Sequence, residues 1–571
     1  MSQKSLQGVA VSEGLTLGTA KIIHLETPAI VETPCIDVAA EIARFQSALN
    51  HSKLQIQQLI QKKGEFLGAE ERKIFEAHVM MIEDPEFVDQ ITDKIKTEKT
   101  DATKAVAQVS DEFAKMLAAL PDPYLSERSH DVRDISLRIL RNLVGQSLDF
   151  SVCDQSGFIL VIKDIAPSMV AELDPKVTIG VITEMGGATS HAAILLRNIE
   201  IPAIFGAKDL FQNINGGDTI LLDAIKGQIL VNPSQADMAQ FKDQKAAYHN
   251  EKTELEKLKF TEAVTKDGVR VYLHANIGGT AEIPVLKKFN PDGVGLFRTE
   301  FLFLDRKAPP TEQEQYEIYK QILATMDNRK TIIRTLDIGG DKDVPYLRIA
   351  KEENPFLGLR GLRYCLENTE IFRTQIRALL KASVYGSLYV MYPMVTTLDE
   401  LKAAQTIVGE EKQKLVSSGV KVSDTIKFGI MIEIPAAAIM AEAFAPHVDF
   451  FSLGTNDLIQ YTTACDRLNP LVKNLYSSFE PSVLRLIDMV SKASIKHGKE
   501  LSICGEMGGQ VTMTPFLLGV GIHHLSMSST LIPKVKKRIL GLTMAECKEL
   551  ATAVLKASTP KEAQEILKKP L

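Results

Sequence analysis

Tryptophan is absent from the 571 residues, and cysteine is scarce, with six residues spread along the chain. The cysteines form no CxxC pair and no closely spaced framework, which excludes a disulfide-rich secreted domain and indicates free thiols in a reducing compartment. No apolar run approaches the roughly 18 residues that a membrane span requires, and the first residues carry no apolar leader. We therefore expect a cytoplasmic protein that is not inserted in a membrane.

An excess of charge of one sign is also lacking. The 66 basic and 72 acidic side chains leave a net charge of -6, and the basic residues are scattered. No broad basic face is expected, which argues against binding to nucleic acid or to an anionic membrane. A chain of this length instead predicts two to four folding units, each large enough to bury its own core.

The hydrophobic pattern changes along the chain and marks the expected domains. Residues 1–36 and 145–233 carry short β-branched runs such as FILVI and TILLD, which predict one α/β domain built from two separate segments. Residues 37–144 have helix spacing and predict an inserted α-helical bundle. The charged segment 234–262 predicts a solvent-exposed linker helix.

Residues 263–571 contain strand-like runs that alternate with helical stretches. The eight runs are VRVYLHANI, GVGLF, KTIIRTLDI, SLYVMYPMV, KFGIMIEI, VDFFSLG, ELSICG and HHLSMS. Eight β-then-α units in about 300 residues are typical of a TIM (β/α)8 barrel. The predicted fold class is α/β multidomain: an α/β domain with an inserted α-helical bundle, followed by a C-terminal TIM barrel.

A glycine-rich turn precedes His191 in the segment GVITEMGGATSHAAILL. Glycines such as Gly187 allow a tight turn whose N–H groups can face an oxyanion, and the start of the next helix adds a positive dipole. The imidazole supplies a nucleophilic nitrogen, and the Thr189 hydroxyl can donate to a phosphate oxygen. The segment predicts a phosphohistidine site at His191; the alternative is that His191 only caps its helix.

Basic side chains follow several of the predicted barrel strands. Because TIM-barrel sites lie where the strands end, Arg298, Arg334 and Arg360 can converge on one mouth. Arginine binds carboxylate and phosphate through paired hydrogen bonds, so these residues predict a small substrate carrying both groups, such as phosphoenolpyruvate. Lys342 and Arg467 add positive charge. The alternative for each arginine is a solvated surface ion pair.

Oxygen ligands and a thiol complete the predicted barrel site. Glu433 follows one strand in GIMIEIP, and Asn456 and Asp457 follow the next in LGTNDL. Mg2+ is usually held by one or two carboxylates with substrate oxygens and water, so Glu433 and Asp457 are the expected ligands. The Cys504 thiol can protonate the methylene carbon of the enolate left after phosphoryl transfer, giving pyruvate. The alternatives are helix caps for the carboxylates and a core position for Cys504.

Motifs from both halves of the chain resemble those of one group of enzymes. GGATSHAAI and the following IPAI resemble the phosphohistidine segment shared by enzyme I, pyruvate phosphate dikinase and phosphoenolpyruvate synthase. The barrel segments FRTEFLF, RTLDIGGDK, NPFLGLRG, FGIMIEIP, FFSLGTNDLIQYT, DRLNP and CGEMGG resemble their phosphoenolpyruvate-binding domain. The resemblance implies a phosphorylated His191, substrate contacts by Arg298, Arg334 and Arg467, substrate support by Asn456 and Lys342, magnesium ligands Glu433 and Asp457, and Cys504 as the acid.

The order of parts is similar to that of enzyme I of the sugar phosphotransferase system. The chain has no glycine-rich nucleotide loop and no room for an ATP-binding domain, unlike the dikinase and the synthase. In enzyme I the helical subdomain docks the histidine phosphocarrier HPr, which implies docking by the region of His78, Asp84 and Glu86. A bundle histidine in core or solvent is the alternative for His78. The resemblance also implies a homodimer formed by the barrel domain.

A truncated synthase-like enzyme and a non-catalytic regulator are the two alternative functions. A truncated synthase-like enzyme requires a nucleotide site that the sequence lacks. A non-catalytic regulator that senses phosphoenolpyruvate and docks the phosphocarrier has no need of a nucleophile and an acid together. Leu359 stands where family members often have an aromatic residue, and Gln510 stands where an acid often follows CGEMGG. These departures bear on turnover and substrate geometry rather than on the reaction type.

Overall fold

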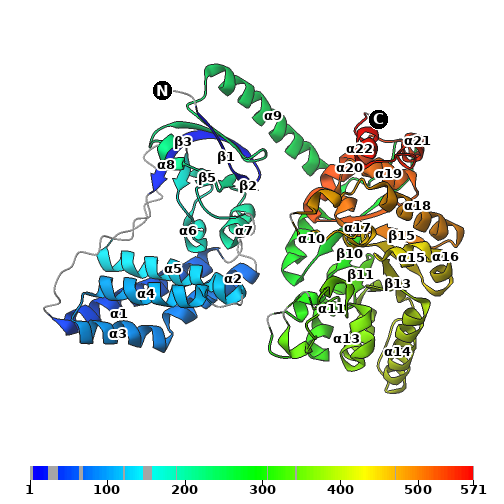
Figure 1. The fold of residues 1–571 in the computed structure, drawn as a ribbon, viewed down its shortest axis with the longest axis horizontal. Coiled ribbons are helices and arrows are strands. Elements are labelled where there is room, and N and C mark those ends of the chain that lie inside the picture. The colour runs from blue at the N-terminus through cyan, green and yellow to red at the C-terminus, as the bar shows by residue number, and fades with distance from the viewer. Residues whose placement is uncertain are drawn as a thin grey trace. The chain divides into compact units, whose positions relative to one another are not determined.

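A computed structural model of the chain forms two compact units, residues 1–251 and residues 252–571 (Figure 1). Each unit has its own hydrophobic core. The residues that the structure describes are 4–23, 37–63, 69–119, 123–145, 157–187, 190–304, 306–340, 342, 344–469 and 471–569. None of the helices in these ranges combines the length and hydrophobicity that crossing a membrane requires.

An eight-stranded sheet forms the centre of the first unit, in the order β1-β8-β7-β3-β4-β5-β6-β2. The strands are β1 (Lys4–Gln7), β2 (Val9–Ser12), β3 (Leu15–Ile23), β4 (Phe158–Ile162), β5 (Thr178–Thr183), β6 (Ala203–Phe205), β7 (Thr219–Asp223) and β8 (Gln228–Val231). Strands β3 to β6 are parallel, and the other pairs are antiparallel. The sheet therefore joins segments from both sides of the helical insertion.

Strand β4 is buried on both faces, which explains its unbroken apolar sequence FILVI. Side chains alternate between the faces of a strand. Phe158, Leu160 and Ile162 accordingly belong to one core, and Ile159 and Val161 belong to another on the opposite face. The first of these cores continues into the helical bundle, so the bundle and the sheet pack as one unit.

Over the described parts of residues 37–145, the helical bundle contains five helices (Figure 1). They are α1 (Val38–Lys63), α2 (Ala69–Ile82), α3 (Pro85–Glu98), α4 (Ala102–Ala118) and α5 (Pro123–Val144). The remaining helices of the sheet domain are α6 (Pro167–Glu172), α7 (His191–Asn198) and α8 (Leu210–Asn213). Asp134 on α5 accepts hydrogen bonds from the Ser168 hydroxyl at 2.6 Å and the Ser168 N–H at 3.2 Å. This contact fastens the bundle to the start of α6.

The charged segment after the sheet forms helix α9 (Gln235–Lys257), which buries Phe241. The two compact units divide within this helix, between Glu251 and Lys252. The expected helix is therefore present, while the finer boundaries of the four expected domains stay a prediction.

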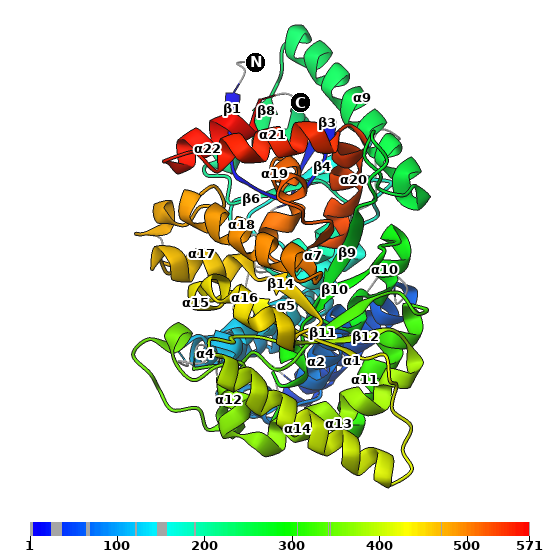
Figure 2. The ribbon, with the colours of Figure 1, turned by 90° about the vertical axis from the view of Figure 1, so that its right-hand side faces the viewer.

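The second unit is a closed barrel of eight parallel strands (Figures 1 and 2). The strands are β9 (Tyr272–Ile277), β10 (Gly293–Phe297), β11 (Thr331–Arg334), β12 (Leu388–Tyr392), β13 (Lys427–Ile432), β14 (Phe450–Leu453), β15 (Glu500–Ile503) and β16 (His524–Met527). Each lies within one of the eight strand-like runs of the sequence. The predicted fold class is confirmed.

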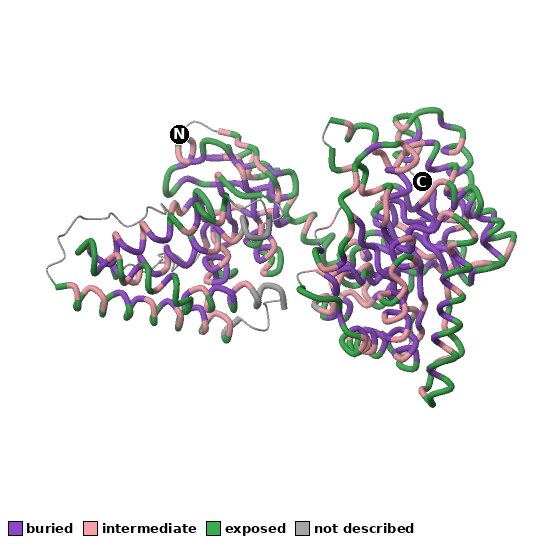
Figure 3. The backbone as a smooth tube through the Cα atoms, turned by 60° about the horizontal axis from the view of Figure 1, so that its bottom comes forward, coloured by how far each residue is buried: buried purple, intermediate pink, exposed green. Residues whose placement is uncertain are grey.

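Helices surround the barrel strands, and Figure 3 shows the buried interior of this unit within a more exposed outer layer. The helices are α10 (Ile283–Phe289), α11 (Glu312–Thr325), α12 (Leu362–Glu367), α13 (Thr369–Ala382), α14 (Leu398–Ser417), α15 (Pro435–Ile439), α16 (Ala441–Phe444), α17 (Thr455–Thr463), α18 (Pro481–Lys496), α19 (Thr514–Gly519), α20 (Ile532–Leu540), α21 (Met544–Val554) and α22 (Pro560–Leu567). Helices α11, α14 and α21 begin with threonine–glutamate capping boxes, which fix where they start.

Candidate active site

Charged and polar side chains lie at the carboxyl ends of the barrel strands. Arg298 follows β10, Arg334 is the last residue of β11 and Glu433 follows β13. Asp457 lies in the first turn of α17 after β14, and Cys504 directly follows β15. Because the strands are parallel and the barrel is closed, these ends share one mouth. The structure therefore brings these residues to the same end of the barrel.

Asp337 is the centre of a buried ion-pair network at this mouth. Its carboxylate accepts hydrogen bonds from Arg360 Nε at 3.2 Å and Nη2 at 2.9 Å, and Arg334 Nη1 lies 3.0 Å from Asp337 Oδ2. Arg334 Nη2 also donates to Glu300 Oε1 at 2.7 Å. Burial alone would raise the pKa of Asp337, but the two guanidinium charges hold it well below its usual range. The network fixes two of the expected substrate-binding arginines.

Glu433 is a buried carboxylate with one unpaired oxygen. Its Oε1 accepts a hydrogen bond from the Met394 N–H at 2.7 Å, while Oε2 has no hydrogen-bond partner. Burial, followed by the charges of Asp457 and Asp337, raises the pKa of Glu433 to about 8. Asp457 Oδ1 also lacks a hydrogen bond, although Arg467 Nη1 lies 3.5 Å away. A bound cation would satisfy these oxygens and offset the repulsion between the carboxylates.

This donor set fits a hard divalent cation that takes part of its coordination from substrate and water. Among the described residues, no group of three or more His, Cys, Asp and Glu side chains is gathered as a complete protein-made metal site would need. Two carboxylates with free oxygens, together with substrate phosphate and water, are a usual ligand set for a Mg2+-type ion. The residues present therefore fit a metal shared between protein and substrate.

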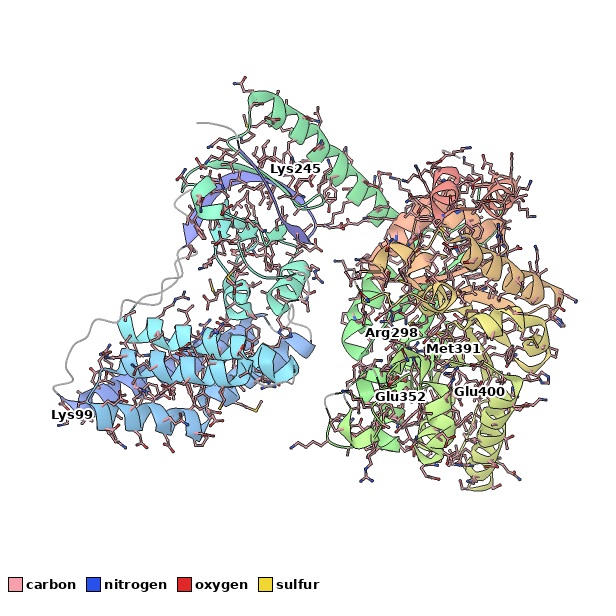
Figure 4. All side chains as sticks on the ribbon, viewed as in Figure 1. Lys99, Lys245, Arg298, Glu352, Met391 and Glu400 are labelled. Atoms are coloured by element: carbon pink, nitrogen blue, oxygen red, sulfur yellow. The ribbon has the colours of Figure 1, made fainter. Side chains whose placement is uncertain are left out.

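The Cys504 thiol is 3% exposed and lines a cavity of about 590 Å3 together with Arg298 and Asn276. Its Sγ donates to the Leu453 carbonyl at 3.5 Å. Burial raises the pKa of the thiol to about 11, so the group holds its proton at neutral pH. Arg298 is exposed and is labelled on the barrel unit in Figure 4. The cavity thus joins a basic side chain to a group able to donate a proton.

Other expected substrate-binding residues contact the loops around the mouth. Lys342 Nζ donates to the Asp337 carbonyl at 3.2 Å. Asn456 is held by Glu506: its Oδ1 accepts from the Glu506 N–H at 3.0 Å, and its Nδ2 donates to Glu506 Oε1 at 3.4 Å. Arg467 reaches Asp457 from the segment after α17. These contacts leave the roles of the residues toward substrate as predictions.

His191 is the first residue of α7 and is exposed. The residue that caps this helix is Ser190, whose hydroxyl accepts a hydrogen bond from the Ala193 N–H at 3.3 Å. Gly186 adopts a φ of 96°, which L-residues with side chains rarely tolerate, and Gly187 has open space around it. The capping alternative for His191 is therefore not supported. Thr189 lies outside the described residues.

The three expected docking residues differ in exposure. Asp84 caps α3 by accepting hydrogen bonds from the N–H groups of Glu86 at 2.8 Å and Phe87 at 3.4 Å. The carboxylates of Asp84 and Glu86 are exposed. The His78 side chain is 1% exposed, and its Nε2 lies 3.4 Å from Asp131 Oδ1 on α5. Its buried position matches the core alternative and does not support direct contact with a partner.

Comparison with known proteins gives matches along the chain. Residues 252–544 match the PEP-binding domain of PEP-utilising enzymes, residues 7–128 match their N-terminal domain and residues 154–227 match their mobile domain. Curated proteins named phosphoenolpyruvate-protein phosphotransferase are 41% identical in Staphylococcus carnosus and 42% identical in Listeria innocua. These matches cover 99% of this chain and 98% and 99% of those proteins. The chain belongs to the phosphoenolpyruvate-protein phosphotransferase family.

Membership of the phosphoenolpyruvate-protein phosphotransferase family has direct consequences. The chain is an enzyme, and the resemblance read from its motifs is confirmed. The alternative of a non-catalytic regulator is disfavoured accordingly. Enzymes of the PEP-utilising group need a divalent metal, which agrees with the carboxylate oxygens of Glu433 and Asp457 that accept no hydrogen bond. The identity of that metal and the roles of single residues stay predictions.

Three residues of the site were not singled out from the sequence. Asp337 and Glu300 hold the guanidinium of Arg334, and Asn276 donates to the backbone carbonyl of Cys504 at 2.9 Å. Asp337 stands three residues after Arg334 in RTLDIGGDK, and Glu300 two residues after Arg298 in FRTEF. The acid close to Arg334 in the sequence was a signal that its charge is compensated, whereas Glu300 pairs with Arg334 rather than with its sequence neighbour Arg298.

Proposed function

We propose that the chain transfers the phosphoryl group of phosphoenolpyruvate to its own His191 and then to the histidine phosphocarrier HPr, releasing pyruvate as the first step of sugar uptake by the phosphotransferase system. The observation that carries the proposal is the convergence of arginines, paired carboxylates and a protonated thiol at one barrel mouth. The exposed His191 at the start of α7 supports its role as the acceptor.

Substrate binding is assigned to the basic groups around the mouth. The groups are Arg298, Arg334, Lys342, Arg360, Asn456 and Arg467. Guanidinium groups bind carboxylate and phosphate oxygens through paired hydrogen bonds. The Asp337 network supports the assignment, because it holds Arg334 and Arg360 in fixed orientations before substrate arrives.

Magnesium is the proposed metal, and Glu433 and Asp457 are its proposed protein ligands. When bound, Mg2+ would neutralise charge on the phosphoryl group during transfer. Glu433 contributes Oε2, which has no hydrogen-bond partner, and Asp457 contributes Oδ1, which lies 3.5 Å from Arg467 Nη1 without a hydrogen bond. The raised pKa of Glu433 supports the assignment, because it reports a carboxylate whose negative charge is poorly compensated without a cation.

The first half-reaction forms a bond between an imidazole nitrogen of His191 and phosphorus and breaks the bond between phosphorus and the bridging oxygen of phosphoenolpyruvate. Gly187 and Thr189 are assigned to support the phosphoryl group on the histidine, through backbone N–H groups and a hydroxyl. Cys504 is assigned to protonate the enolate that remains. Its pKa of about 11 suits a thiol that keeps its proton until the enolate forms.

The second half-reaction passes the phosphoryl group to HPr docked on the helical bundle. The exposed carboxylates of Asp84 and Glu86 suit a partner with a basic rim, while the buried His78 supports the bundle from within. His191 and the barrel site belong to different compact units. The reaction cycle therefore requires the units to move, and α9 is the proposed hinge region.

A homodimer in the cytoplasm is also proposed. The segment after α17 exposes three large apolar side chains, Leu468, Leu471 and Leu475. Exposed apolar groups of this size in one short segment suit contact with a second copy of the chain. Sedimentation velocity tests the proposal: the unaltered chain should sediment as a dimer, and Leu471→Asp should shift it toward the monomer.

The proposed reaction is tested by following pyruvate release from full-length protein with Mg2+ and phosphoenolpyruvate, without ATP or phosphocarrier. The unaltered protein should release about one equivalent of pyruvate in its first turnover, because His191 is the only acceptor proposed. His191→Ala should release none but should still bind phosphoenolpyruvate in the barrel. His51→Ala, at an exposed position on α1, is the matched control. A full first turnover by His191→Ala would contradict the proposal.

A further inference from the structure

Asn276 links three neighbouring strands at the barrel mouth. It lies in β9, and its Nδ2 donates to the Cys504 carbonyl beyond β15 at 2.9 Å. Its Oδ1 accepts a hydrogen bond from the Ser526 hydroxyl on β16. Strands β15, β16 and β9 are consecutive in the barrel. The Asn276 side-chain amide therefore crosses β16 and contacts the backbone of Cys504.

The backbone ladder does not extend to the Cys504 carbonyl. Strands β15 and β16 pair Ser502 with His524 and Ile503 with Leu525, and Cys504 lies one residue further on. A backbone carbonyl at the end of a parallel ladder needs another donor when it is shielded from water. Asn276 supplies that donor and thereby fixes the peptide between Cys504 and Gly505.

Gly295 on β10 leaves the space that Ser526 occupies. A Cβ atom at this position would lie 2.2 Å from Ser526 Oγ and 2.5 Å from Ser526 Cβ. Contacts this short require a neighbour to move, so only glycine fits beside the serine as it stands. The glycine on β10, the serine on β16 and the asparagine on β9 thus form one matched arrangement around the Cys504 backbone, which we call the Asn276 clamp.

The Cys504 thiol makes its own hydrogen bond in addition to the contact at its backbone carbonyl. Cys504 Sγ donates to the Leu453 carbonyl at 3.5 Å, an ordinary distance for a sulfur donor, and Asn276 Nδ2 donates to the Cys504 carbonyl at 2.9 Å. Asn276 and Cys504 also line the same cavity as Arg298. The clamp therefore fixes the backbone from which the thiol projects, while the bond to the Leu453 carbonyl holds the sulfur itself.

We propose that Asn276 is a positioning residue that aims the Cys504 thiol at the methylene carbon of the enolate, with Ser526 orienting the asparagine amide. The inference rests on the proposed function, in which Cys504 is the acid. In that step the S–H bond breaks and its proton forms a C–H bond at the methylene carbon, while the enolate oxygen becomes the ketone oxygen of pyruvate. The electron pair stays on sulfur, and the thiolate regains a proton from water.

Asn276→Asp is the sharpest test, because it keeps the shape of the side chain and an acceptor for Ser526 but removes the donor to Cys504. The full-length protein is given (Z)-[3-2H]phosphoenolpyruvate in tritiated water, and the configuration of the pyruvate methyl group is measured. Protonation by a fixed thiol gives one configuration, whereas protonation of released enolate in solution gives a mixture. We expect one configuration from the unaltered protein and a mixture from Asn276→Asp.

The rates of phosphorylation of His191 and of protonation of the enolate should also respond differently to Asn276→Asp. A displacement of about 1 Å can slow a positioned step by about 100-fold, so enzyme-bound proton delivery should fall by roughly 10- to 100-fold in Asn276→Asp. Phosphorylation of His191 should fall less than proton delivery does, because Arg334 and Arg360 keep their contacts with Asp337. Asn276→Asp also adds a negative charge to the cavity shared with Arg298, and Ser526→Ala, which adds none, separates the effect of that charge from the loss of positioning. Asn328→Asp makes the same chemical change at an exposed turn before β11 and should behave like the unaltered protein.

Ser526→Ala and Cys504→Ala decide between the remaining outcomes. Ser526→Ala removes the hydrogen bond that orients the Asn276 amide. The pyruvate methyl group should then be a less complete mixture of configurations than with Asn276→Asp. If Asn276→Asp does not bind substrate, Ser526→Ala alone tests the positioning role. A mixture from Cys504→Ala with one configuration retained in both Asn276→Asp and Ser526→Ala would overturn the positioning role alone. One configuration retained in Cys504→Ala would instead refute Cys504 as the acid.

Discussion

Glu433 should weaken the metal-free fold at the pH at which the enzyme works. It is 1% exposed, its Oε2 has no hydrogen-bond partner, and burial together with Asp457 and Asp337 raises its pKa from 4.5 to about 8. A raised pKa means that the folded chain holds the proton more tightly than the unfolded chain. The contribution of Glu433 to the free energy of unfolding is therefore fully present below pH 4.5 and is lost as the pH rises toward 8.

The size of the effect follows from the two pKa values. Their difference, at 1.36 kcal/mol for each pH unit, corresponds to about 5 kcal/mol for ionising Glu433 in the metal-free fold, and about 2 kcal/mol of it falls between pH 6 and pH 8. The neutral amide in Glu433→Gln avoids this penalty. The variant should therefore gain about 2 kcal/mol on the unaltered protein between these pH values, or roughly 3 °C in the melting temperature of the barrel unit.

Differential scanning calorimetry of the full chain without divalent metal measures this difference. The melting temperature of Glu433→Gln should exceed that of the unaltered protein by more at pH 8 than at pH 6. Glu549→Gln, an exposed position on α21, should change the melting temperature by less than about 1 °C at both pH values. Equal melting temperatures for Glu433→Gln and the unaltered protein at pH 8 would refute the reasoning.

Three further changes test the charge arrangement of the barrel. Asp337→Asn leaves Arg334 and Arg360 without their shared carboxylate and should lower the free energy of unfolding by about 3 kcal/mol in a urea titration; a loss below about 1 kcal/mol would contradict the network. The pKa of Glu411 is lowered to about 2, because two arginines and a lysine outweigh the effect of burial, so its stabilisation is complete above pH 4.5 and lost as the pH falls toward 2. Glu411→Gln should accordingly remove about 3 kcal/mol at pH 7 and flatten the acid limb of the stability curve, and an unchanged acid limb would count against this. Arg298→Ala should weaken phosphoenolpyruvate binding at least roughly tenfold in calorimetric titration while leaving the melting temperature within about 2 °C, since the side chain is exposed; unchanged affinity would remove Arg298 from the site.

The sequence predicted the barrel because each strand is a short apolar run that ends in polar or glycine-containing segments. β10 and β14 show this plainly: GVGLF is followed by Arg298, and FFSL is followed by Gly454 and Asn456. A strand buried on both faces needs an unbroken apolar run, and a connecting loop does not. The residue boundaries of the four predicted domains stay a prediction, because a change of hydrophobic pattern along the sequence does not fix the residue at which one domain ends.

The site was only partly predictable for a different reason. Arg334 and Glu433 could be predicted as site residues because the active site of a TIM barrel lies where the strands end. Asp337 read as part of the strand-like run KTIIRTLDI, because its place three residues after Arg334 does not reveal that it meets two arginines. Asn276 read as part of a strand, because its partners Cys504 and Ser526 are more than 200 residues away. Contacts of this separation are set by barrel closure and leave no local pattern.

The central claim is that His191 carries the phosphoryl group. Full-length protein is incubated with Mg2+ and radiolabelled phosphoenolpyruvate, digested under alkaline conditions, and the label is mapped to a peptide. The account predicts a label on the His191 peptide that is lost in acid, survives alkali and forms without ATP. A label on any other peptide, or no label while pyruvate is released, would contradict it.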